Sequence, residues 1–469
     1  MNKKKICVML LSWLFIASAF GQIPTILSKG KADSQGCKEW VESRLEKMTL
    51  KEKIGQLFIH TVPLHDTEVN RKNIRNAVKE YKVGGFLFDN GQLVNQVNLT
   101  NYAQEMAEIP LLITFDGEWG LNMRLKEIPA FPRNRVLGCI QDNNLLYEYG
   151  KEVARQFREI GVHVNFAPVA DVDNNPLNPV INTRSFGGDV RNVTEKVLAY
   201  SKGLEDGGVL SVSKHFPGHG DCEVDSHLGL PTINYDLDRI HRIEMHPFKE
   251  NINVPAIMSA HIMFPAYDTV PATLSKNILT NVLRNELGFE GLILTDCLEM
   301  KAIADMYGTA NGALMAVLAG ADLCDISHTL EYQIKALELL EEAVNDGRLP
   351  VEELDKKVER ILKFKEKTLP YLEKYFYNQE MIYSEENNKL AQKIVDNSLT
   401  KVLGNDATLT NNTLIIAPVA MARTIIEDEF DERNLAKVLR KEFANVDVRE
   451  LVNTNEFKEE ILSILCLLC

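Results

Sequence analysis

Residues 214–227 read KHFPGHGDCEVDSH and hold three histidines, three acids and a lysine within fourteen positions. A buried core does not tolerate so many ionisable groups unless each has a polar partner. The Pro-Gly and His-Gly pairs argue against a continuous helix. We therefore expect a functional loop whose side chains take part in acid-base chemistry or in ligand binding.

The end of this stretch places an acid and an imidazole two residues apart, at Asp225 and His227. At that spacing the carboxylate can hold one ring nitrogen and leave the other facing a substrate. A surface Asp-Ser turn with a bystander histidine is one alternative. A zinc site built from His215, His219 and His227 is another. Pro217 makes it the least favoured, because it denies His215 and His219 a shared helical face.

The surrounding sequence alternates short apolar segments with amphipathic helical segments such as 145–160, 193–205 and 279–287. The eight apolar segments that we predict as strands are residues 54–60, 83–88, 111–115, 163–169, 209–215, 256–261, 291–295 and 321–326. Alternation of this type builds a parallel sheet. Eight such units predict an α/β fold, a (β/α)8 TIM-type barrel.

Polar residues recur at the ends of these predicted strands. They are Asp116 after the third, Asp171 and Asp173 after the fourth, Lys214 and His215 at the end of the fifth, His261 at the end of the sixth and Asp296 after the seventh. Catalytic groups of such barrels lie at the carboxyl ends of the strands. Capping of the following helix would explain one or two of these residues, but not the whole set.

The amino-terminal sequence predicts that the protein is exported. Three lysines precede an apolar run at 6–20, and small residues stand before Gln22, as in a cleaved signal peptide at residues 1–21. A membrane anchor is the alternative, but the run is short for a span, and we expect no membrane span after cleavage. Loss of the three lysines takes the net charge from -14 to -17. Such a surface repels nucleic acid, and a bacterial periplasm is the predicted location.

The domain boundaries follow from the same patterns. We predict the barrel over residues 22–370, a helical linker over 371–400 and a partial α/β domain over 401–469. This last part holds a strand pattern at 412–420, a helix near 434–443 and a second strand at 446–451. Two strands are too few for a covered parallel sheet. We therefore expect a truncated second domain.

Four motifs together resemble glycoside hydrolase family 3. They are KHFPGHG followed by DSH, FDGEWGLNMR at 115–124, NFAPVADVDNNP with NTRSFGGD at 165–189, and LILTDCLEM at 292–300. The DSH element is similar to the β-N-acetylhexosaminidase branch, which cleaves terminal N-acetylglucosamine. The resemblance covers about residues 39–370 and implies a retaining glycosidase.

The resemblance assigns roles to the reactive residues. A retaining glycosidase needs a nucleophile and an acid that later acts as a base. Asp296 ends an apolar strand and matches the family's nucleophilic aspartate; a helix cap is the alternative. His227 matches the acid/base, and Asp225 matches the residue that orients it.

Other matched residues are expected to bind the sugar. Asp116 matches the aspartate that holds sugar hydroxyls, as bidentate carboxylate hydrogen bonds allow. The further candidates for hydroxyl or acetamido recognition are Arg124, Arg184, Lys214 and His215. Ordinary salt bridges are the alternative for each. Trp119 replaces a family glycine, which predicts a narrowed site or a sugar-stacking surface, and Cys222 predicts a looser loop.

Three other functions stay open at this point. One is an exo-β-glucosidase of the same family, whose acid/base comes from a second domain. The second is a glycoside phosphorylase, because an imidazole does not repel phosphate as a carboxylate would. The third is a non-catalytic saccharide-binding module, although Asp296 and His227 are both present. We predict a small saccharide or glycan as partner and neither a metal nor a cofactor, and the pattern favours no particular oligomeric state.

Overall fold

The computed structural model describes residues 34–327, 329–382, 384–399, 414–418, 435–442 and 447–451. The chain divides into two compact units, residues 1–399 and 400–469. The predicted signal peptide at residues 1–21 lies outside the described residues.

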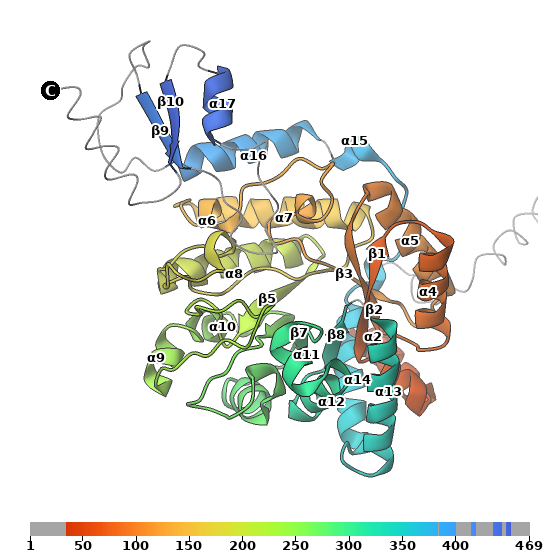
Figure 1. Ribbon diagram of the computed structural model, residues 1–469. Helices are drawn as coiled ribbons and strands as arrows, with labels where there is room; N and C mark the ends of the chain where they lie inside the picture. Colours follow the sequence, from red (N-terminus) through yellow and green to blue (C-terminus); the bar gives the residue numbers. More distant parts are fainter. Residues whose placement is uncertain are drawn as a thin grey trace, which may run out of the picture. The chain divides into compact units, whose positions relative to one another are not determined.

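The first unit contains a closed barrel of eight parallel strands (Figure 1). The strands are β1 (Phe58–Leu64), β2 (Gly85–Gly91), β3 (Leu112–Phe115), β4 (Val164–Asn165), β5 (Leu210–Phe216), β6 (Ala256–Ser259), β7 (Leu292–Cys297) and β8 (Leu323–Ile326). Each strand pairs with its sequence neighbour, and β1 pairs with β8 to close the barrel, with Phe58 opposite Cys324. The structure confirms the predicted (β/α)8 barrel.

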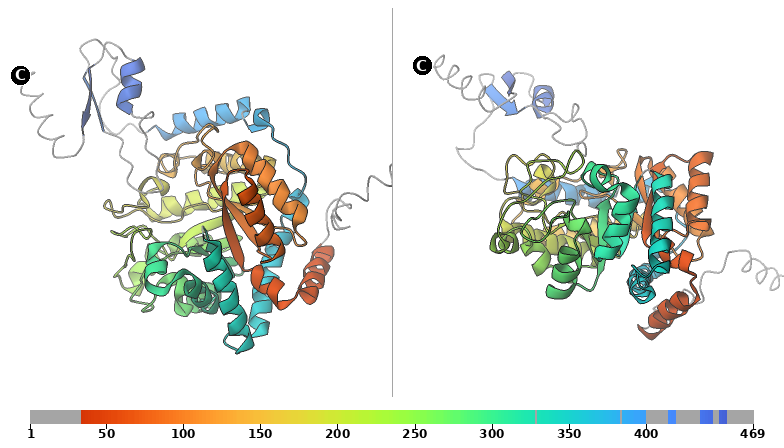
Figure 2. Two further views of the ribbon diagram at one scale, coloured as in Figure 1. Left: turned by 45° about the vertical axis from the view of Figure 1, so that its right-hand side comes forward. Right: turned by 60° about the horizontal axis from the view of Figure 1, so that its bottom comes forward.

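Helices surround the strands in both views of Figure 2. The helices between and after the strands are α4 (Glu68–Lys79), α5 (Leu93–Met106), α7 (Asn143–Glu159), α8 (Val190–Asp206), α10 (His246–Glu250), the π-helical η4 (Asn277–Glu286), α12 (Thr309–Ala319), α13 (Leu330–Asn345) and α14 (Val351–Glu366). Side-chain caps fix several starts. Asp142 accepts from Asn144 N before α7, and Asp189 accepts from Asn192 N before α8.

Shorter elements complete the loops and the amino-terminal side. They are α2 (Ser34–Lys47), α3 (Leu50–Gly55), η1 (Leu121–Met123), α6 (Asn134–Leu137), η2 (Asn182–Arg184), α9 (Leu237–Arg242), η3 (Ala272–Leu274) and α11 (Lys301–Tyr307). Two of the loops carry predicted site residues: Asp116 and Arg124 follow β3, and Asp225 and His227 follow β5.

The bounds of every strand differ from the prediction by a residue or more, and two strands differ most. The predicted first strand at 54–60 overlaps α3, because Thr49 and Glu52 form a capping box that starts a helix at Leu50, and β1 begins only at Phe58. The predicted fourth strand at 163–169 is regular only over β4. Pro168 has no backbone N–H to continue the ladder.

The barrel wall is buried, as parallel strands covered by helices require, although it holds polar as well as apolar side chains. All seven residues of β5 are buried, including the polar Lys214 and His215 at its carboxyl end. Aromatic rings join the wall to the helices, as where Phe115 of β3 meets Phe157 of α7 with 5.1 Å between ring centroids. A rigid wall of this type fixes the side chains at the strand ends.

The segment after α14 packs on the barrel. It contains η5 (Leu369–Tyr371), α15 (Gln379–Ile382) and α16 (Glu385–Ser398), and α16 lies beside α7 (Figure 1). Tyr375 receives a hydrogen bond from Asn101 Nδ2 at 2.8 Å, and its hydroxyl lies 3.3 Å from His163 Nε2. The predicted linker segment therefore belongs to the first unit as far as residue 399.

The described part of the second unit is small. It consists of β9 (Leu414–Pro418), α17 (Leu435–Glu442) and β10 (Asp447–Leu451), and the two strands pair in parallel. These elements fall within the three segments predicted there. The expected truncation of a second domain stays a prediction.

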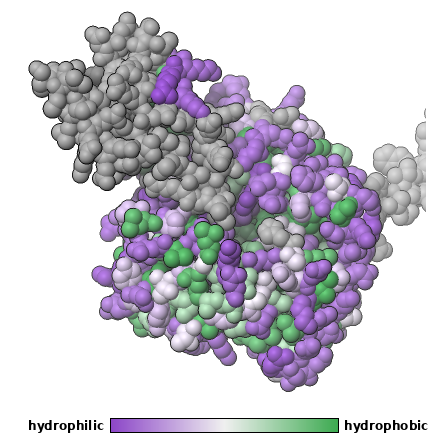
Figure 3. Space-filling view, viewed as in Figure 1, coloured by the Kyte–Doolittle hydropathy of each residue, from purple (hydrophilic) through white to green (hydrophobic). Residues whose placement is uncertain are grey.

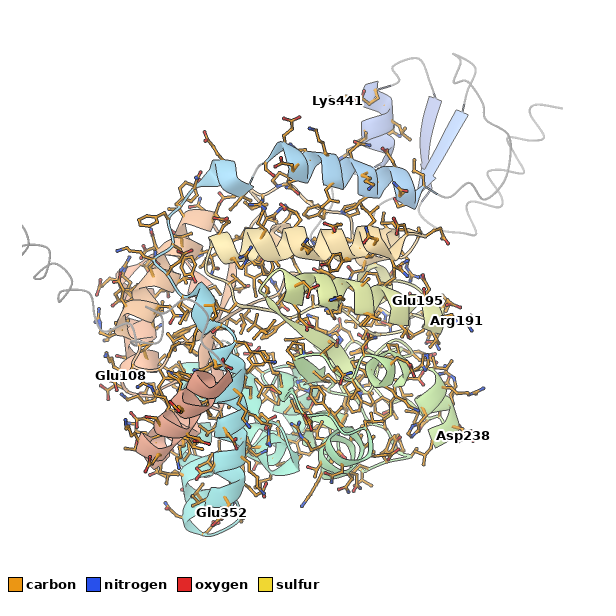
Figure 4. The ribbon with its side chains drawn as sticks, turned by 180° about the vertical axis from the view of Figure 1, so that it is seen from behind. Glu108, Arg191, Glu195, Asp238, Glu352 and Lys441 are labelled. Atoms are coloured by element: carbon orange, nitrogen blue, oxygen red, sulfur yellow. The ribbon has the colours of Figure 1, made fainter. Side chains whose placement is uncertain are left out.

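Hydrophilic side chains cover much of the face drawn in Figure 3, with apolar side chains scattered among them. Arg191, Glu195, Asp238 and Glu352 stand on the outer sides of their helices (Figure 4), and Glu108 lies on the outside just after α5. Among the described residues, no helix combines the length and apolar character needed to cross a membrane.

Candidate active site

The carboxyl ends of β3 to β8 bring the predicted reactive side chains to one rim of the barrel. Asp116 follows β3, and Lys214 and His215 end β5. His261 follows β6, and Asp296 lies near the end of β7. Hydrogen bonds and ion pairs link these strand ends, so the rim is a candidate active site of the type found in barrel enzymes.

Asp116 lies between two cations. Lys214 Nζ donates to its Oδ1 at 3.0 Å, and Arg124 Nη2 donates to its Oδ2 at 2.7 Å. Burial opposes ionisation of Asp116, but the two cations outweigh burial and hold the pKa of its carboxyl well below the usual range. The structure thus brings together three of the predicted sugar-binding residues.

Glu118, which the sequence analysis did not assign to the site, organises the next part. Arg184 forms a bidentate pair with it, with Nε to Oε2 at 2.9 Å and Nη2 to Oε1 at 2.7 Å. Lys214 Nζ lies 2.9 Å from the same Oε1. Burial raises the pKa of Glu118, but Arg184 and Lys214 lower it more, to about 2. Arg184 is therefore buried and paired, and its Nη2 lies 3.4 Å from His215 Nε2.

The turn between Asp116 and Glu118 depends on Gly117. Its N–H donates to Asn165 Oδ1 at 3.1 Å, and Asn165 Nδ2 donates back to its carbonyl at 3.1 Å. A Cβ atom at this position would lie 2.4 Å from the ring of Phe157. Glycine thus lets the backbone pack against β4 and α7, which aims both acids at Lys214.

Asp171 is a second residue that the site assignment missed. One of its oxygens accepts from the backbone N–H of His215 at 3.1 Å, and the other lies 2.7 Å from His215 Nδ1. The carboxylate therefore holds the Nδ1–H, and Nε2 faces Asp296 Oδ2 at 3.9 Å. Asp173, by contrast, pairs with Arg135.

Asp296 is a partly accessible carboxylate among cationic and imidazole groups. Its Oδ1 accepts from the N–H of Cys297 at 2.7 Å, and about a quarter of the side chain, 24%, is exposed. Burial opposes ionisation, but the charges of His215, His261 and His227 outweigh it and lower the pKa of Asp296. The group is an anion at neutral pH, as a nucleophile must be.

The spacing of Asp225 and His227 gives the geometry that the sequence predicted. Asp225 Oδ1 accepts from the backbone N–H of His227 at 2.8 Å and lies 2.7 Å from its Nδ1. Burial raises the pKa of Asp225, but these hydrogen bonds lower it more, so the acid stays ionised. His227 is partly exposed, at 23%, and its charge acts on Asp296. Nδ1 is thus occupied, and Nε2 is left for a substrate.

The three histidines of the zinc alternative have separate partners. His215 Nδ1 is bound by Asp171, His219 Nε2 lies 3.0 Å from Ser226 Oγ, and His227 Nδ1 is held by Asp225. Within the described part of the chain, no three side chains of the types that ligate metals converge as a metal site.

Two buried groups on neighbouring strands complete the rim. His261 Nε2 lies 2.9 Å from the carbonyl of Cys297, and its Nδ1 lies 2.8 Å from Thr273 Oγ1. Asp325 on β8 accepts from Ser327 Oγ at 3.2 Å. Burial, and then the charge of Asp296, raise the pKa of Asp325 well above its usual value. Burial and the neighbouring Asp296 thus favour the neutral form of Asp325, a residue that the sequence analysis did not single out.

The structure places both unusual residues, Trp119 and Cys222, in the interior. Trp119 is buried, and the guanidinium of Arg133 covers its ring at 4.4 Å, so it offers no stacking surface to a sugar. Cys222 is fully buried in the apolar core, and its neighbour Asp221 pairs with Arg239. Cys222 therefore helps to pack the loop.

The rim thus carries an ionised aspartate and a carboxylate-held histidine at the strand ends, where barrel enzymes have their catalytic groups. The chain matches the Glycosyl hydrolase family 3 N terminal domain over residues 49–364. Because this match covers well over half of the chain, the protein belongs to glycosyl hydrolase family 3.

The chain is also similar to individual proteins with a named activity. The chain is 36% identical over 328 residues to Beta-hexosaminidase A from Pseudoalteromonas piscicida, which is 63% of this chain and 55% of that relative. The chain therefore spans only about half the length of that protein. A glycoside hydrolase family 3 beta-N-acetylglucosaminidase from Paenibacillus sp. str. FPU-7 is similar with a TM-score of 0.77 and 34% identity, over 89% of this chain and 82% of that one.

A solved structure of a different activity is also similar. Beta-glucoside phosphorylase BglX, bound to 2FGlc, matches with a TM-score of 0.78 and 25% identity, over 91% of this chain and 80% of that one. Similar folds therefore occur in a protein named as a beta-N-acetylglucosaminidase and in one named as a beta-glucoside phosphorylase.

Proposed function

We propose that the protein is a retaining exo-β-N-acetylglucosaminidase that removes terminal β-linked N-acetylglucosamine. The observation that carries this proposal is the Asp225–His227 pair, 2.7 Å from Oδ1 to Nδ1, on a loop beside the ionised Asp296. His227 as the acid/base and Asp296 as the nucleophile are the two groups that a retaining glycosidase needs, and both belong to the barrel unit. The names of the hexosaminidase relatives support the choice of sugar.

In the first step Asp296 attacks the anomeric carbon and forms a glycosyl ester. The bond to the leaving oxygen breaks with its electron pair, and the proton on His227 Nε2 moves to that oxygen. Asp225 keeps Nδ1 protonated and stabilises the ring while it is an imidazolium. The aglycone leaves as a neutral alcohol.

In the second step His227 acts as a base. Nε2 takes a proton from water, the water oxygen bonds to the anomeric carbon, and the ester bond to Asp296 breaks. The carboxylate is restored, and Nε2 carries the proton needed for the next turnover. Two displacements on one carbon return the original anomeric configuration.

The ionic network beside Asp296 suits sugar recognition. Asp116 presents carboxylate oxygens to vicinal hydroxyls, while Arg124 and Lys214 hold it in place and offer donors of their own. Arg184 acts through Glu118 and lies against the His215 ring. These contacts restrict the freedom of the first sugar and favour the attack geometry.

A phosphorylase is the second candidate. The similarity to Beta-glucoside phosphorylase BglX favours it, as does the use of an imidazole rather than a carboxylate near the acceptor. In that reaction phosphate would attack the glycosyl ester in place of water, and the product would be a sugar phosphate.

A panel of 4-nitrophenyl β-glycosides, assayed with and without phosphate, separates these activities. We expect the N-acetylglucosaminide to be turned over far faster than the glucoside, with no effect of phosphate. His241→Ala, at a histidine on α9 that bonds Tyr267, is the matched control and should behave as wild type. Equal rates on both sugars would point to a broader glucosidase. A strong phosphate dependence with a sugar phosphate product would establish the phosphorylase.

A further inference from the structure

Ser226, between the catalytic pair Asp225 and His227, does not face solvent. Its Oγ lies 3.0 Å from Nε2 of His219, and both side chains are 2% exposed. Its carbonyl accepts from the N–H of Ala302 at the start of α11, at 3.3 Å. One residue thus ties the loop both to the core and to the helix that follows β7.

His219 is itself fixed in place. Its N–H donates to Asp171 Oδ1 at 2.7 Å, and Asn178 Nδ2 donates to its carbonyl at 2.8 Å. The next residue, Gly220, lies so close to Val172 that a Cβ would stand 1.8 Å from the Val172 carbonyl oxygen. The backbone of His219 is therefore held in place, and its buried ring can serve as a fixed point for Ser226.

Asp171 joins this fixed point to the other side of the site. While one oxygen accepts from His219 N–H, the other lies 2.7 Å from His215 Nδ1, and His215 Nε2 faces Asp296 at 3.9 Å. The buried carboxylate of Asp171 therefore positions both His215, which faces Asp296, and His219, which contacts Ser226 in the loop. The path contains only hydrogen bonds and short contacts.

The bond from His219 to Ser226 joins two neutral groups at neutral pH. Burial, and then the neighbouring His215, lower the pKa of His219 to about 4. Removal of the Ser226 hydroxyl therefore leaves no buried charge behind, and the barrel should still fold. The change acts on the position of the loop rather than on the charge of the site.

We propose that Ser226 and His219 form a latch that holds the loop at 225–227 in the position where His227 reaches the leaving oxygen. The inference rests on the proposed function, because it concerns the acid/base of that reaction. Both are positioning residues, since they act through His227. A displaced general acid loses effect most where the leaving group needs protonation most.

The test compares a poor leaving group with a good one. The substrates are N,N'-diacetylchitobiose and 2,4-dinitrophenyl N-acetylglucosaminide. For Ser226→Ala we expect kcat on the disaccharide to fall about 10- to 100-fold, as for a displaced catalytic group, with little change on the aryl glycoside and in KM. Ser226→Thr keeps the hydroxyl and should restore much of the rate.

Two controls isolate the latch. Ser201 on α8 is as buried as Ser226, but its hydroxyl has no hydrogen-bond partner within the described residues. Ser201→Ala should therefore leave the rates on both substrates unchanged. The double variant His219→Ala/Ser226→Ala should lose little more activity than the worse of the two single variants, because the effects of two residues that share one hydrogen bond are not additive. Additive losses, equal losses on both substrates, or no loss would overturn the latch.

His227→Ala, assayed in parallel, keeps this result distinct from a failure of the proposed function. If His227→Ala shows the leaving-group dependence and Ser226→Ala does not, the latch is wrong and the acid/base assignment stands. If His227→Ala slows both substrates equally, the assignment itself fails.

Discussion

At the scale of single residues, the surroundings of each rim acid decide its ionisation. Burial disfavours the charged form of Asp116, Glu118 and Asp325 alike. Arg184 and Lys214 keep Glu118 ionised, and Lys214 and Arg124 keep Asp116 ionised, whereas the charge of Asp296 adds to burial in raising the pKa of Asp325. Burial therefore acts in the same direction on all three acids, and the neighbouring charges decide which way each pKa moves.

The proposed nucleophile gives the first residue-scale prediction. Asp296→Ala should lower kcat by more than about 10³-fold, because removal of a covalent nucleophile stops the main path. A 2-fluoro sugar with a good leaving group should label Asp296 in the wild type, as seen by peptide mass spectrometry. Asp305→Ala, at an exposed aspartate on α11, serves as control and should keep full activity. A label on another residue, or an inverted product, would refute the assignment.

Part of the site could be predicted from the sequence because it is local. Asp225 and His227 lie two positions apart, and Asp296 ends a strand, so pattern and spacing locate them. Glu118 and Asp171 have partners 66 and 44 residues away, at Arg184 and His215. No local pattern encodes such a pairing, so the sequence could not show which strand-end acids complete the rim.

At the scale of elements, the alternation of apolar and amphipathic segments predicted all eight strands. The main errors in the strand bounds came where an apolar run is compatible with either a helix or a strand. Ile54 belongs to α3, because the capping box at Thr49 starts a helix that a count of apolar residues does not detect. The η4 segment was predicted as helical, but its π-helical geometry is not visible in a hydrophobic period.

Helix α14 carries a buried lysine that should affect stability against pH. Lys365 is fully buried, donates to Gln56 Oε1 at 2.6 Å, and burial lowers its pKa to about 7 from 10.5. Between these values the unfolded chain binds more protons, so the free energy of unfolding should rise with pH by up to about 1.4 kcal/mol per unit. This contribution is lost as the pH falls through 7.

Urea unfolding at pH 7, 8 and 9 measures this contribution. Lys365→Met should flatten the rise, while Lys363→Met, at an exposed position of the same helix, should keep the wild-type slope. Identical slopes for Lys365→Met and wild type would show that the buried amine does not titrate in this range.

At the scale of the whole molecule, the candidate site lies entirely in the first unit. Every residue assigned to it falls between Asp116 and Asp325, and the unit extends to residue 399. The proposed nucleophile, acid/base and orienting carboxylate all belong to this unit, so the proposal assigns no catalytic role to residues 400–469, in contrast to a glucosidase whose acid/base comes from a second domain.

A chain that ends at Leu399 tests this independence. We expect it to keep the rate and the leaving-group dependence of the full chain on N-acetylglucosaminides, because it retains His227, Asp225 and Asp296. Circular dichroism would establish that the shortened chain is folded. A folded but inactive product would mean that residues 400–469 supply a group to the reaction.

The burial of Trp119 has an optical consequence. The sequence holds three tryptophans, and this one stands beside Glu118 with the Arg133 guanidinium 4.4 Å from its ring. Indole emission depends on nearby charge, and a cation over the ring face is a direct electrostatic contact. A saccharide that rearranges the Arg184–Glu118–Lys214 group therefore changes the field at a natural fluorophore, so occupancy of the rim can be followed in the unlabelled protein.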